Sequence, residues 1–145
     1  MNKHEELALK YFTKGYNCAQ SVFAAFHEEM GLEEKTALKM SSAFGGGMGR
    51  LREVCGAVSG MFMVLSTLYG YDNTEDSEAK KLLYSRVQAL AEEFKKEYGA
   101  IICRELLASP DVKKAAPVQG SGHAGFCFEY VKTAARIMSE FIEKN

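Results

Sequence analysis

Residues 44–60 read FGGGMGRLREVCGAVSG, and the rest of the chain is organised around this stretch. A glycine-rich segment that carries Arg50 and Arg52 leads into the expected start of a helix, and Cys55 lies in or near the first turn of that helix. Helix N-termini carry partial positive charge and unpaired N–H groups, so a thiol beside arginines there should ionise more readily than a free cysteine. The stretch therefore predicts a thiol site.

The helix that follows, at about residues 53–68, is the predicted centre of the fold. Apolar or small residues occupy every side of it, which is typical of a buried helix. Gly56 and Gly60 would let a second backbone approach closely. The 18 residues from Val54 to Tyr71 carry no charge, but they include glycine, serine and threonine. We therefore expect a core helix and no membrane insertion.

Helical spacing of apolar residues predicts further helices on both sides of this one, at about 3–14, 17–30, 33–43, 76–98, 100–107 and 124–143. Asn17 is a suitable N-cap for the second helix, and Gly99 should end the long one. Leu38 and Met40 are expected to point inward, as is Leu82 on the long helix. No segment alternates as a strand does. The sequence predicts an all-α helical bundle of roughly five to seven helices, formed as a single domain over residues 1–145.

Composition excludes several classes of function. The chain of 145 residues has a net charge of −1 and a pI near 6.3, which does not fit a nucleic-acid-binding surface. The N-terminus lacks the basic and apolar layout of a signal peptide, so we expect a cytoplasmic protein. Thiols are kept reduced in that compartment, and the four cysteines are therefore expected to be ligands, redox groups or small buried residues rather than permanent disulfides.

The positions of the four cysteines indicate a shared site. Cys18, Cys55 and Cys127 fall at or near predicted helix N-termini, and Cys103 lies four residues into the short helix after Gly99. Burial explains any one cysteine, because free cysteine behaves as a small hydrophobic residue. Simple burial would more often place cysteines in the middle of helices. We therefore expect thiolates gathered where helix starts converge, with their pKa lowered by the helix dipoles.

Three chemistries remain open for such a set. The cysteines are 37, 48 and 24 residues apart, so the chain has no C-x-x-C pair, and tertiary structure must assemble the site. Four such thiolates could bind zinc, hold an iron–sulfur cluster or cycle between dithiol and disulfide. Zinc is the less favoured metal because its structural sites usually include a closely spaced cysteine pair. For dithiol chemistry, we expect Cys55 to attack, with Arg50 or Arg52 favouring its anion.

Neighbouring residues could tune this site. His123 lies four residues before Cys127 and could act as a base, as a metal ligand or simply as a solvated loop residue, whereas His4 and His27 are expected in solvent. The glycine-rich segment lacks the lysine of a P-loop. It is either a connection that passes close to neighbouring backbone or a site where N–H groups and Arg50 hold an anion. The glycines concerned are Gly45, Gly46, Gly47 and Gly49.

The cysteine motifs resemble those of the C_GCAxxG_C_C family of redox-active proteins, which is defined by four cysteines and a Cys-Gly-Ala-x-x-Gly motif. The motif is intact over residues 55–60, and the likeness extends to residues 17–22, to residues 44–48 and to the later single cysteines, Cys103 and Cys127. The resemblance implies a helical, cytoplasmic protein with a redox role. It also implies that related domains occur fused or linked to electron-transfer proteins, which favours the iron–sulfur alternative. The resemblance names no substrate.

A second class of function is a binding module without redox turnover. In this alternative the cysteines hold structural zinc or stay as free thiols, and the glycine segment receives a small anion or a partner protein. The redox hypothesis instead requires a redox partner protein or a small thiol or disulfide substrate. Under either hypothesis the small-residue faces of the central helix could support a homodimer.

Overall fold

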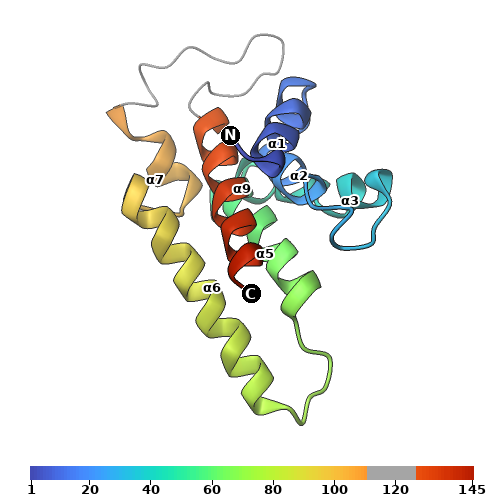
Figure 1. Cartoon of the computed structure of the whole chain (residues 1–145). Coiled ribbons are helices and arrows are strands. Elements are labelled where there is room, and N and C mark those ends of the chain that lie inside the picture. Colours follow the sequence, from blue (N-terminus) through green and yellow to red (C-terminus); the bar gives the residue numbers. More distant parts are fainter. Residues whose placement is uncertain (111–126) are drawn as a thin grey trace.

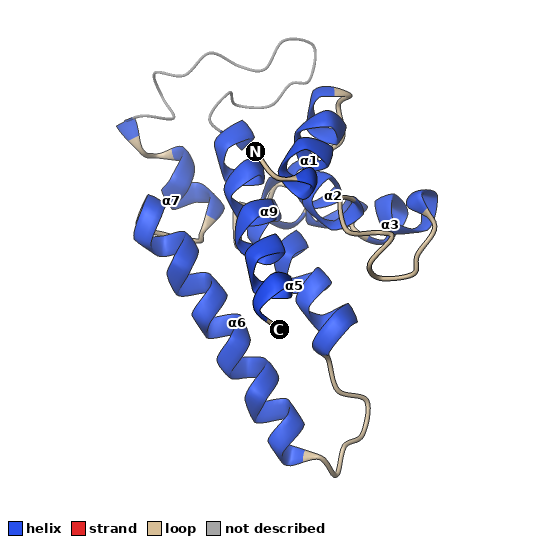
Figure 2. Cartoon of the chain, viewed as in Figure 1, coloured by secondary structure: helices blue, strands red, loops and turns tan. Residues whose placement is uncertain are grey.

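The computed structural model describes residues 1–110 and 127–145. Over these residues the chain is helical and contains no strand, which confirms the all-α prediction (Figure 2). The elements are α1 (Lys3–Thr13), α2 (Cys18–Ala24), α3 (Glu34–Met40), the 3₁₀ turn η1 (Ser42–Phe44), α4 (Gly45–Met48), α5 (Gly56–Tyr69), α6 (Ser77–Tyr98), α7 (Cys103–Leu107) and α9 (Cys127–Lys144). Figure 1 shows α5 and α9 in the middle of the molecule, with α6 and α7 on one side and α1 to α3 on the other.

Asparagine caps begin the first two helices. The side chain of Asn17 accepts a hydrogen bond from the amide of Gln20, and the Gln20 side chain accepts one from the amide of Asn17. Asn2 and Glu5 make the same reciprocal pair at the start of α1. Each pair satisfies amides that the first helical turn leaves without partners. The cap at Asn17 is as predicted, and it fixes the position of Cys18 as the first residue of α2.

α2 and α3 are shorter than the sequence predicts. α2 ends at Ala24 rather than near Met30, because the next amides turn back to carbonyls three residues away, as in the bond from Phe26 to Phe23. The predicted helix at 33–43 is divided into α3 and η1. Leu38 is buried as expected, but Met40 is 49% exposed, so its predicted inward orientation is wrong.

α5 is the central helix, and its first half is buried on all sides. It begins at Gly56, three residues later than predicted, because the preceding residues are extended and Val54 forms a single antiparallel bridge with Ile102. A Cβ atom at Gly60 would lie 2.8 Å from the carbonyl oxygen of Ala19 in α2. Gly60 therefore allows the backbones of α2 and α5 to touch. No helix in the described ranges is long and apolar enough to cross a membrane.

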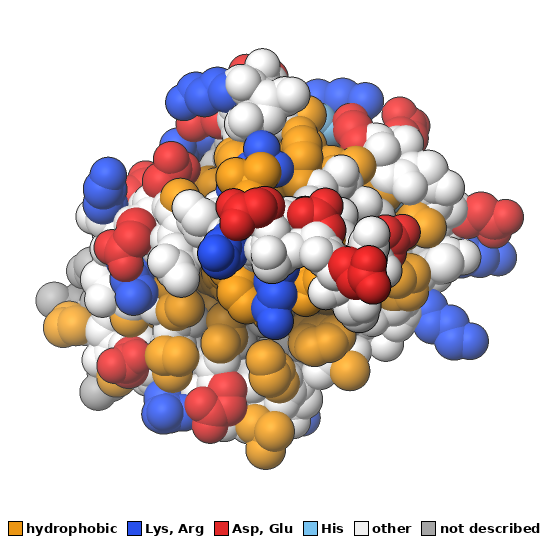
Figure 3. All heavy atoms as spheres, turned by 90° about the horizontal axis from the view of Figure 1, so that it is seen from below, with side chains coloured by type: hydrophobic (Ala, Val, Ile, Leu, Met, Phe, Trp, Pro, Cys, Tyr) orange, Lys and Arg blue, Asp and Glu red, His pale blue; other side chains and the backbone are white. Residues whose placement is uncertain are grey.

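α6 and α9 are the longest helices. α6 ends at Gly99, whose φ of 80° suits glycine, and it buries Leu83, Leu90 and Phe94. Leu82 was predicted on the same buried stripe but is 52% exposed. Seen from the end where α5 joins α6, hydrophobic side chains lie at the surface among charged ones (Figure 3). α9 packs against α1, α2 and α5, and its amphipathic pattern explains why Val131, Ile137 and Met138 are buried.

Candidate functional site

A cavity of about 500 Å³ is lined by all four cysteines, and we call it the cysteine cavity. Its described wall also includes Phe12, Asn17, Gly45, Gly46, Gly49, Arg50, Arg52, Gly56, Leu106, Leu107 and Tyr130. The cysteines reach it from α2, the start of α5, α7 and α9. The structure thus brings together residues that are separated by up to 109 positions, from Cys18 to Cys127.

Cys18 lies against the backbone at the start of α5. A Cβ atom added to Gly56 would collide with Cys18 Sγ and would lie 2.9 Å from the carbonyl oxygen of Phe44. Any larger residue at position 56 would therefore push the Cys18 sulfur away. These contacts explain both glycines of the Cys-Gly-Ala-x-x-Gly motif. Gly56 leaves space for the Cys18 thiol, and Gly60 leaves space for the backbone of α2, the helix that carries this thiol.

A short backbone pairing sets Cys55 beside Cys103. The amide of Cys55 donates to the carbonyl of Ile101 at 2.8 Å, and the amide of Cys103 donates to the carbonyl of Glu53 at 2.5 Å. These bonds flank the bridge between Val54 and Ile102. Cys103 is the first residue of α7, so its predicted position four residues into the short helix is wrong. The reason is that residues 100–102 belong to this backbone pairing, so the helix begins only after them.

The glycine-rich segment forms a left-handed turn. Five consecutive residues, 46–50, have positive φ between 58° and 72°, although Met48 and Arg50 are not glycines. A left-handed conformation costs L-residues about 1–2 kcal/mol each, which explains the glycines at the other three positions. A Cβ atom at Gly47 would also lie 2.7 Å from Cys103 Cβ. The segment therefore passes close to neighbouring atoms, one of the two alternatives that the sequence left open.

Burial raises the pKa of three of the four thiols. Loss of water is the largest effect on Cys18 and on Cys55, and it raises the pKa of both above the ordinary value. Burial, followed by charges on Cys18 and Cys103, raises the pKa of Cys127 to about 12, and Arg52 opposes this rise. The prediction that helix N-termini lower these thiol pKa values is therefore wrong for Cys18, Cys55 and Cys127.

Backbone amides oppose this effect but do not overcome it. The amides of Gly46 and Ala19 favour a thiolate at Cys18, and those of Ala57 and Val58 favour one at Cys55. The neutral Cys55 thiol nevertheless makes no capping hydrogen bond to α5. Charge repulsion between Cys18 and Cys55 adds to the cost of burial. At Cys18 and Cys55 the neutral thiol is therefore favoured over the thiolate.

Arg52 is the arginine that contacts a thiol. Its Nη1 atom donates to Cys103 Sγ at 3.8 Å. The sequence placed both arginines beside Cys55 instead, and it could not show that the left-handed turn redirects Arg52. Arg50 lines the cavity, and its backbone amide donates to the carbonyl of Gly45 at 3.4 Å, but its side chain makes no hydrogen bond or ion pair with any described residue. His123, predicted as a tuning group, lies outside the described residues.

Two polar residues of the wall, Asn17 and Tyr130, were not predicted from the sequence as site residues. Asn17 was predicted only as an N-cap, but its side chain also lies against Gly45, where a Cβ atom would collide with it. Tyr130 lies three residues after Cys127 on α9, and its hydroxyl donates to the carbonyl of Leu106 at 3.3 Å. The i, i+3 spacing of Tyr130 and Cys127, which places both on one helix face, is the signal that could have identified the tyrosine.

Metal binding by a single ion is not favoured by the described geometry. Within residues 1–110 and 127–145, no three side chains of His, Cys, Asp or Glu are grouped so as to hold one metal ion. All four cysteines are free. The thiols therefore surround the cavity rather than a single point.

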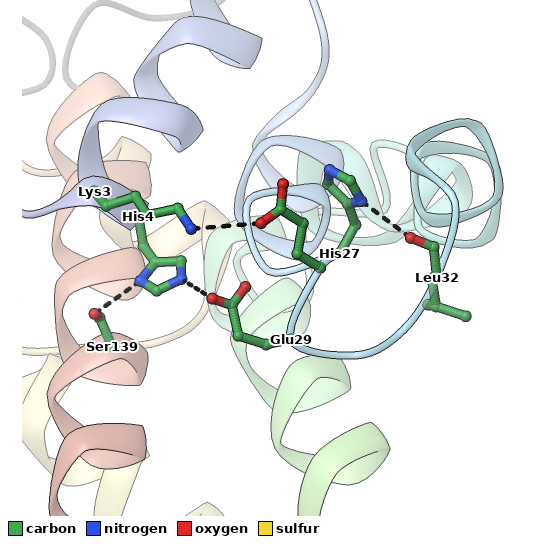
Figure 4. Close-up of polar contacts among 7 residues, drawn as sticks. Lys3, His4, His27, Glu29, Leu32 and Ser139 are labelled. Atoms are coloured by element: carbon green, nitrogen blue, oxygen red, sulfur yellow. Dashed lines mark hydrogen bonds and ion pairs between the residues drawn. The ribbon is translucent and has the colours of Figure 1, made fainter.

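A second polar cluster lies away from the cavity and consists of His4, Glu29 and Ser139 (Figure 4). We call it the His4 cluster. His4 Nδ1 lies 2.9 Å from Ser139 Oγ, and His4 Nε2 lies 2.8 Å from a Glu29 oxygen. The imidazole also stacks on Phe26 at a centroid distance of 4.2 Å. The prediction of a solvated His4 is therefore wrong, because the ring joins α1 to α9. His27 is also engaged, with Nδ1 3.0 Å from the Leu32 carbonyl oxygen.

The sequence profile of one family matches residues 16–141 of the chain. The family is C_GCAxxG_C_C, and its description is "Putative redox-active protein (C_GCAxxG_C_C)". The matched range includes the four cysteines and the glycine-rich segment. No curated protein and no solved structure matches the chain.

Proposed function

The chain belongs to the C_GCAxxG_C_C family, and from this premise we propose that it is a thiol–disulfide redox protein whose reaction takes place in the cysteine cavity. The observation that carries the proposal is the gathering of four thiols around one cavity of about 500 Å³, with a guanidinium at one of them. A cavity of this size admits a small molecule in addition to the thiols. A family with a general redox role supports the same assignment.

In this reaction Cys103 is the attacking thiol. Cys103 Sγ, facing Arg52, attacks one sulfur of a substrate disulfide, the substrate S–S bond breaks, and one half leaves as a thiolate that takes up a proton. A mixed disulfide between Cys103 and the other half remains. Cys55 is a weaker candidate than the sequence suggested, because burial raises its pKa well above the ordinary value and the arginine contact among the described residues goes to Cys103 instead.

Cys18 completes the reaction as the resolving thiol. Cys18 and Cys103 line the same cavity, and a charge on Cys103 raises the pKa of Cys18, which supports this pairing. The Cys18 thiolate attacks Cys103 Sγ and releases the second half of the substrate. The substrate disulfide has then gained two electrons and two protons, and the protein holds a disulfide between Cys18 and Cys103. A dithiol reductant returns the protein to its starting state by the reverse exchange.

An iron–sulfur cluster is the second candidate, and the backbone amides favour it. The amides of Gly46 and Ala19 favour a thiolate at Cys18, and those of Ala57 and Val58 favour one at Cys55. Such N–H groups stabilise cysteine thiolates that ligate clusters and tune their potential. Cys18, Cys55, Cys103 and Cys127 would hold the cluster, which would supply one-electron transfer. A single zinc ion fits less well, because the described residues offer no three-ligand group.

An anaerobic preparation separates the candidates. Iron, zinc, the visible spectrum and free thiols are measured before and after one equivalent of a thiol oxidant. Disulfide chemistry predicts no stoichiometric metal and the loss of about two thiols per chain, restored by dithiothreitol. Stoichiometric iron with charge-transfer absorption would establish the second candidate instead. Four metal-free thiols that never change would refute both.

Serine variants then test the roles of the cysteines. Cys103→Ser should stop reaction with a small disulfide at its first step. Cys18→Ser should permit that step and accumulate the mixed disulfide, which intact-mass spectrometry detects as the added half of the substrate. If Cys103→Ser still forms the mixed disulfide and Cys55→Ser does not, the attacking thiol is Cys55 rather than Cys103.

A further inference from the structure

The charged side chains among the described residues that line the cysteine cavity all have one sign. Among the described residues that line it, Arg50 and Arg52 are the two with a charged side chain, and none is an aspartate or glutamate. The thiols themselves are neutral at physiological pH where burial has raised their pKa, as at Cys55 and Cys127. The described wall therefore has a net positive charge, although the chain as a whole has a net charge of −1.

Arg50 is an exposed residue at this wall, and its side chain has no partner among the described residues. The nearest acidic residue in sequence, Glu53, pairs with Arg104 at 3.1 Å. Arg136 pairs with Glu97 at 2.6 Å, and Arg52 donates to Cys103. Among these arginines, Arg50 alone has a side chain with neither an ion pair nor a hydrogen bond to a described residue, and its φ of 66° is a conformation that L-residues adopt at a cost.

We propose that the substrate of the cysteine cavity is a small disulfide that carries carboxylates, with Arg50 binding a carboxylate while Cys103 attacks the disulfide. The inference rests on the proposed function and names its substrate class. A guanidinium binds a carboxylate through two parallel hydrogen bonds, so Arg50 would fix the orientation of the substrate as well as attract it. The bonds that form and break are those of the exchange described above. The carboxylate undergoes no chemistry.

Three disulfides of similar size and different charge test the inference. They are 3,3′-dithiodipropionate, which is dianionic, bis(2-hydroxyethyl) disulfide, which is neutral, and cystamine, which is dicationic. The rate at which each disulfide oxidises the reduced protein is measured at low salt. It is divided by the rate at which the same disulfide oxidises a neutral small thiol. This division removes differences in intrinsic reactivity. We expect the anionic disulfide to exceed the neutral one by about tenfold and the cationic one to react most slowly.

Variants locate the effect. Arg50→Gln should reduce the anionic-to-neutral ratio to near one, and Arg50→Lys should retain part of it because the charge remains. Lys39→Gln is the matched control, since Lys39 lies on α3 outside the cavity wall and its replacement removes the same charge from the chain. This control should keep the full ratio.

The outcomes distinguish the substrate from the function. Equal normalised rates for the three disulfides, or a ratio that Arg50→Gln leaves intact, would overturn the inference and leave the thiol–disulfide function standing. Failure of all three disulfides to oxidise the reduced protein would overturn the proposed function and the inference with it.

Discussion

The cysteine cavity and the His4 cluster are both assembled from distant parts of the chain, but they differ in whether their polar groups have partners. In the His4 cluster, both nitrogens of His4 have partners and its ring stacks on Phe26. In the cavity, thiols with raised pKa values and an arginine without a described partner face open volume. Satisfied polar groups stabilise a fold, whereas unsatisfied groups around a cavity are available for chemistry.

The two regions also differ in backbone strain, which is found beside the cavity and not in the His4 cluster. The non-glycine residues with positive φ among those described are Met48, Arg50 and Arg52, and all three belong to the loop beside the cavity. The His4 cluster has none. Strain of this kind persists where surrounding structure enforces it, and it is concentrated at functional sites. The comparison therefore makes predictions about stability as well as about reactivity.

Gly56→Ala should give the largest effect. The added methyl group would collide with Cys18 Sγ, and we expect the free energy of unfolding to fall by about 3 kcal/mol. In a Cys18→Ala background the colliding sulfur is absent, so the same change should cost at least about 1 kcal/mol less. Denaturant unfolding of the four proteins in this cycle measures the difference.

Gly60→Ala is the matched control for that cycle. Its added methyl group would meet the backbone oxygen of Ala19 at 2.8 Å rather than a sulfur. The cost of Gly60→Ala should therefore be the same with and without Cys18. Equal coupling of Cys18 to both glycines would mean that the sulfur does not occupy the space left by Gly56.

Alkylation of Cys127 tests the cost of ionising a cavity thiol. Burial first, and then charges on Cys18 and Cys103, raise the pKa of Cys127 from 9.0 to about 12. At pH 8 the thiolate fraction of Cys127 should be roughly 10³-fold lower in the folded protein than in the unfolded chain. A thiolate of higher pKa is also more nucleophilic, so we expect the rate of alkylation by iodoacetamide to fall by only about 30-fold. Mass spectrometry of timed samples with and without urea gives both rates. Equal rates would contradict the raised pKa.

The same shift predicts how stability depends on pH. The folded protein holds the Cys127 proton more tightly than the unfolded chain does, since the folded pKa is the higher one. The stabilisation is therefore complete below about pH 9 and is lost as pH rises toward about 12. Cys127→Ser should make this alkaline loss shallower in unfolding curves recorded across that range.

The sequence predicted the helices well and the site only in part. Local signals identified the cap at Asn17 and the stop at Gly99, because capping depends on neighbours in sequence. The cysteine placements also indicated one shared site. The direction of the thiol pKa was wrong because the helix dipole is local, whereas burial is set by the whole fold. The contacts of His4 with Ser139, 135 residues away, have no local signal at all.

His4→Ala should destabilise the fold without changing the cavity. It removes the stacking on Phe26 and leaves Ser139, which is 4% exposed, with one partner fewer, so we expect a loss of about 2 kcal/mol. His27→Ala removes one hydrogen bond to a carbonyl and should cost about 1 kcal/mol or less. Thiol alkylation rates of the native His4→Ala protein should match those of the parent. A change in those rates would mean that the two regions are coupled.

Acid should weaken the His4 cluster through Glu29. Burial raises the pKa of Glu29, but its hydrogen bond with His4, its own backbone amide and the charges of His4 and Lys3 together lower the pKa below the ordinary value. A lowered folded pKa contributes stability above the unfolded pKa of about 4.3 and loses it as pH falls further. Glu29→Gln should therefore flatten the acid side of the stability profile, and an unchanged acid side would contradict this assignment.

Met48→Gly should give the smallest effect and the opposite sign. Met48 has a φ of 69° and is 36% exposed, so glycine removes left-handed strain and little packing. Glycine also makes the unfolded chain more flexible, and we expect a net gain of about 0.5 kcal/mol. Met40→Gly is the matched control because Met40 lies in the right-handed helix α3 and is 49% exposed. There the same change should cost about 1 kcal/mol. Opposite signs in denaturant unfolding would localise the strain to the loop beside the cavity, and a loss at both positions would show that Met48 is not strained.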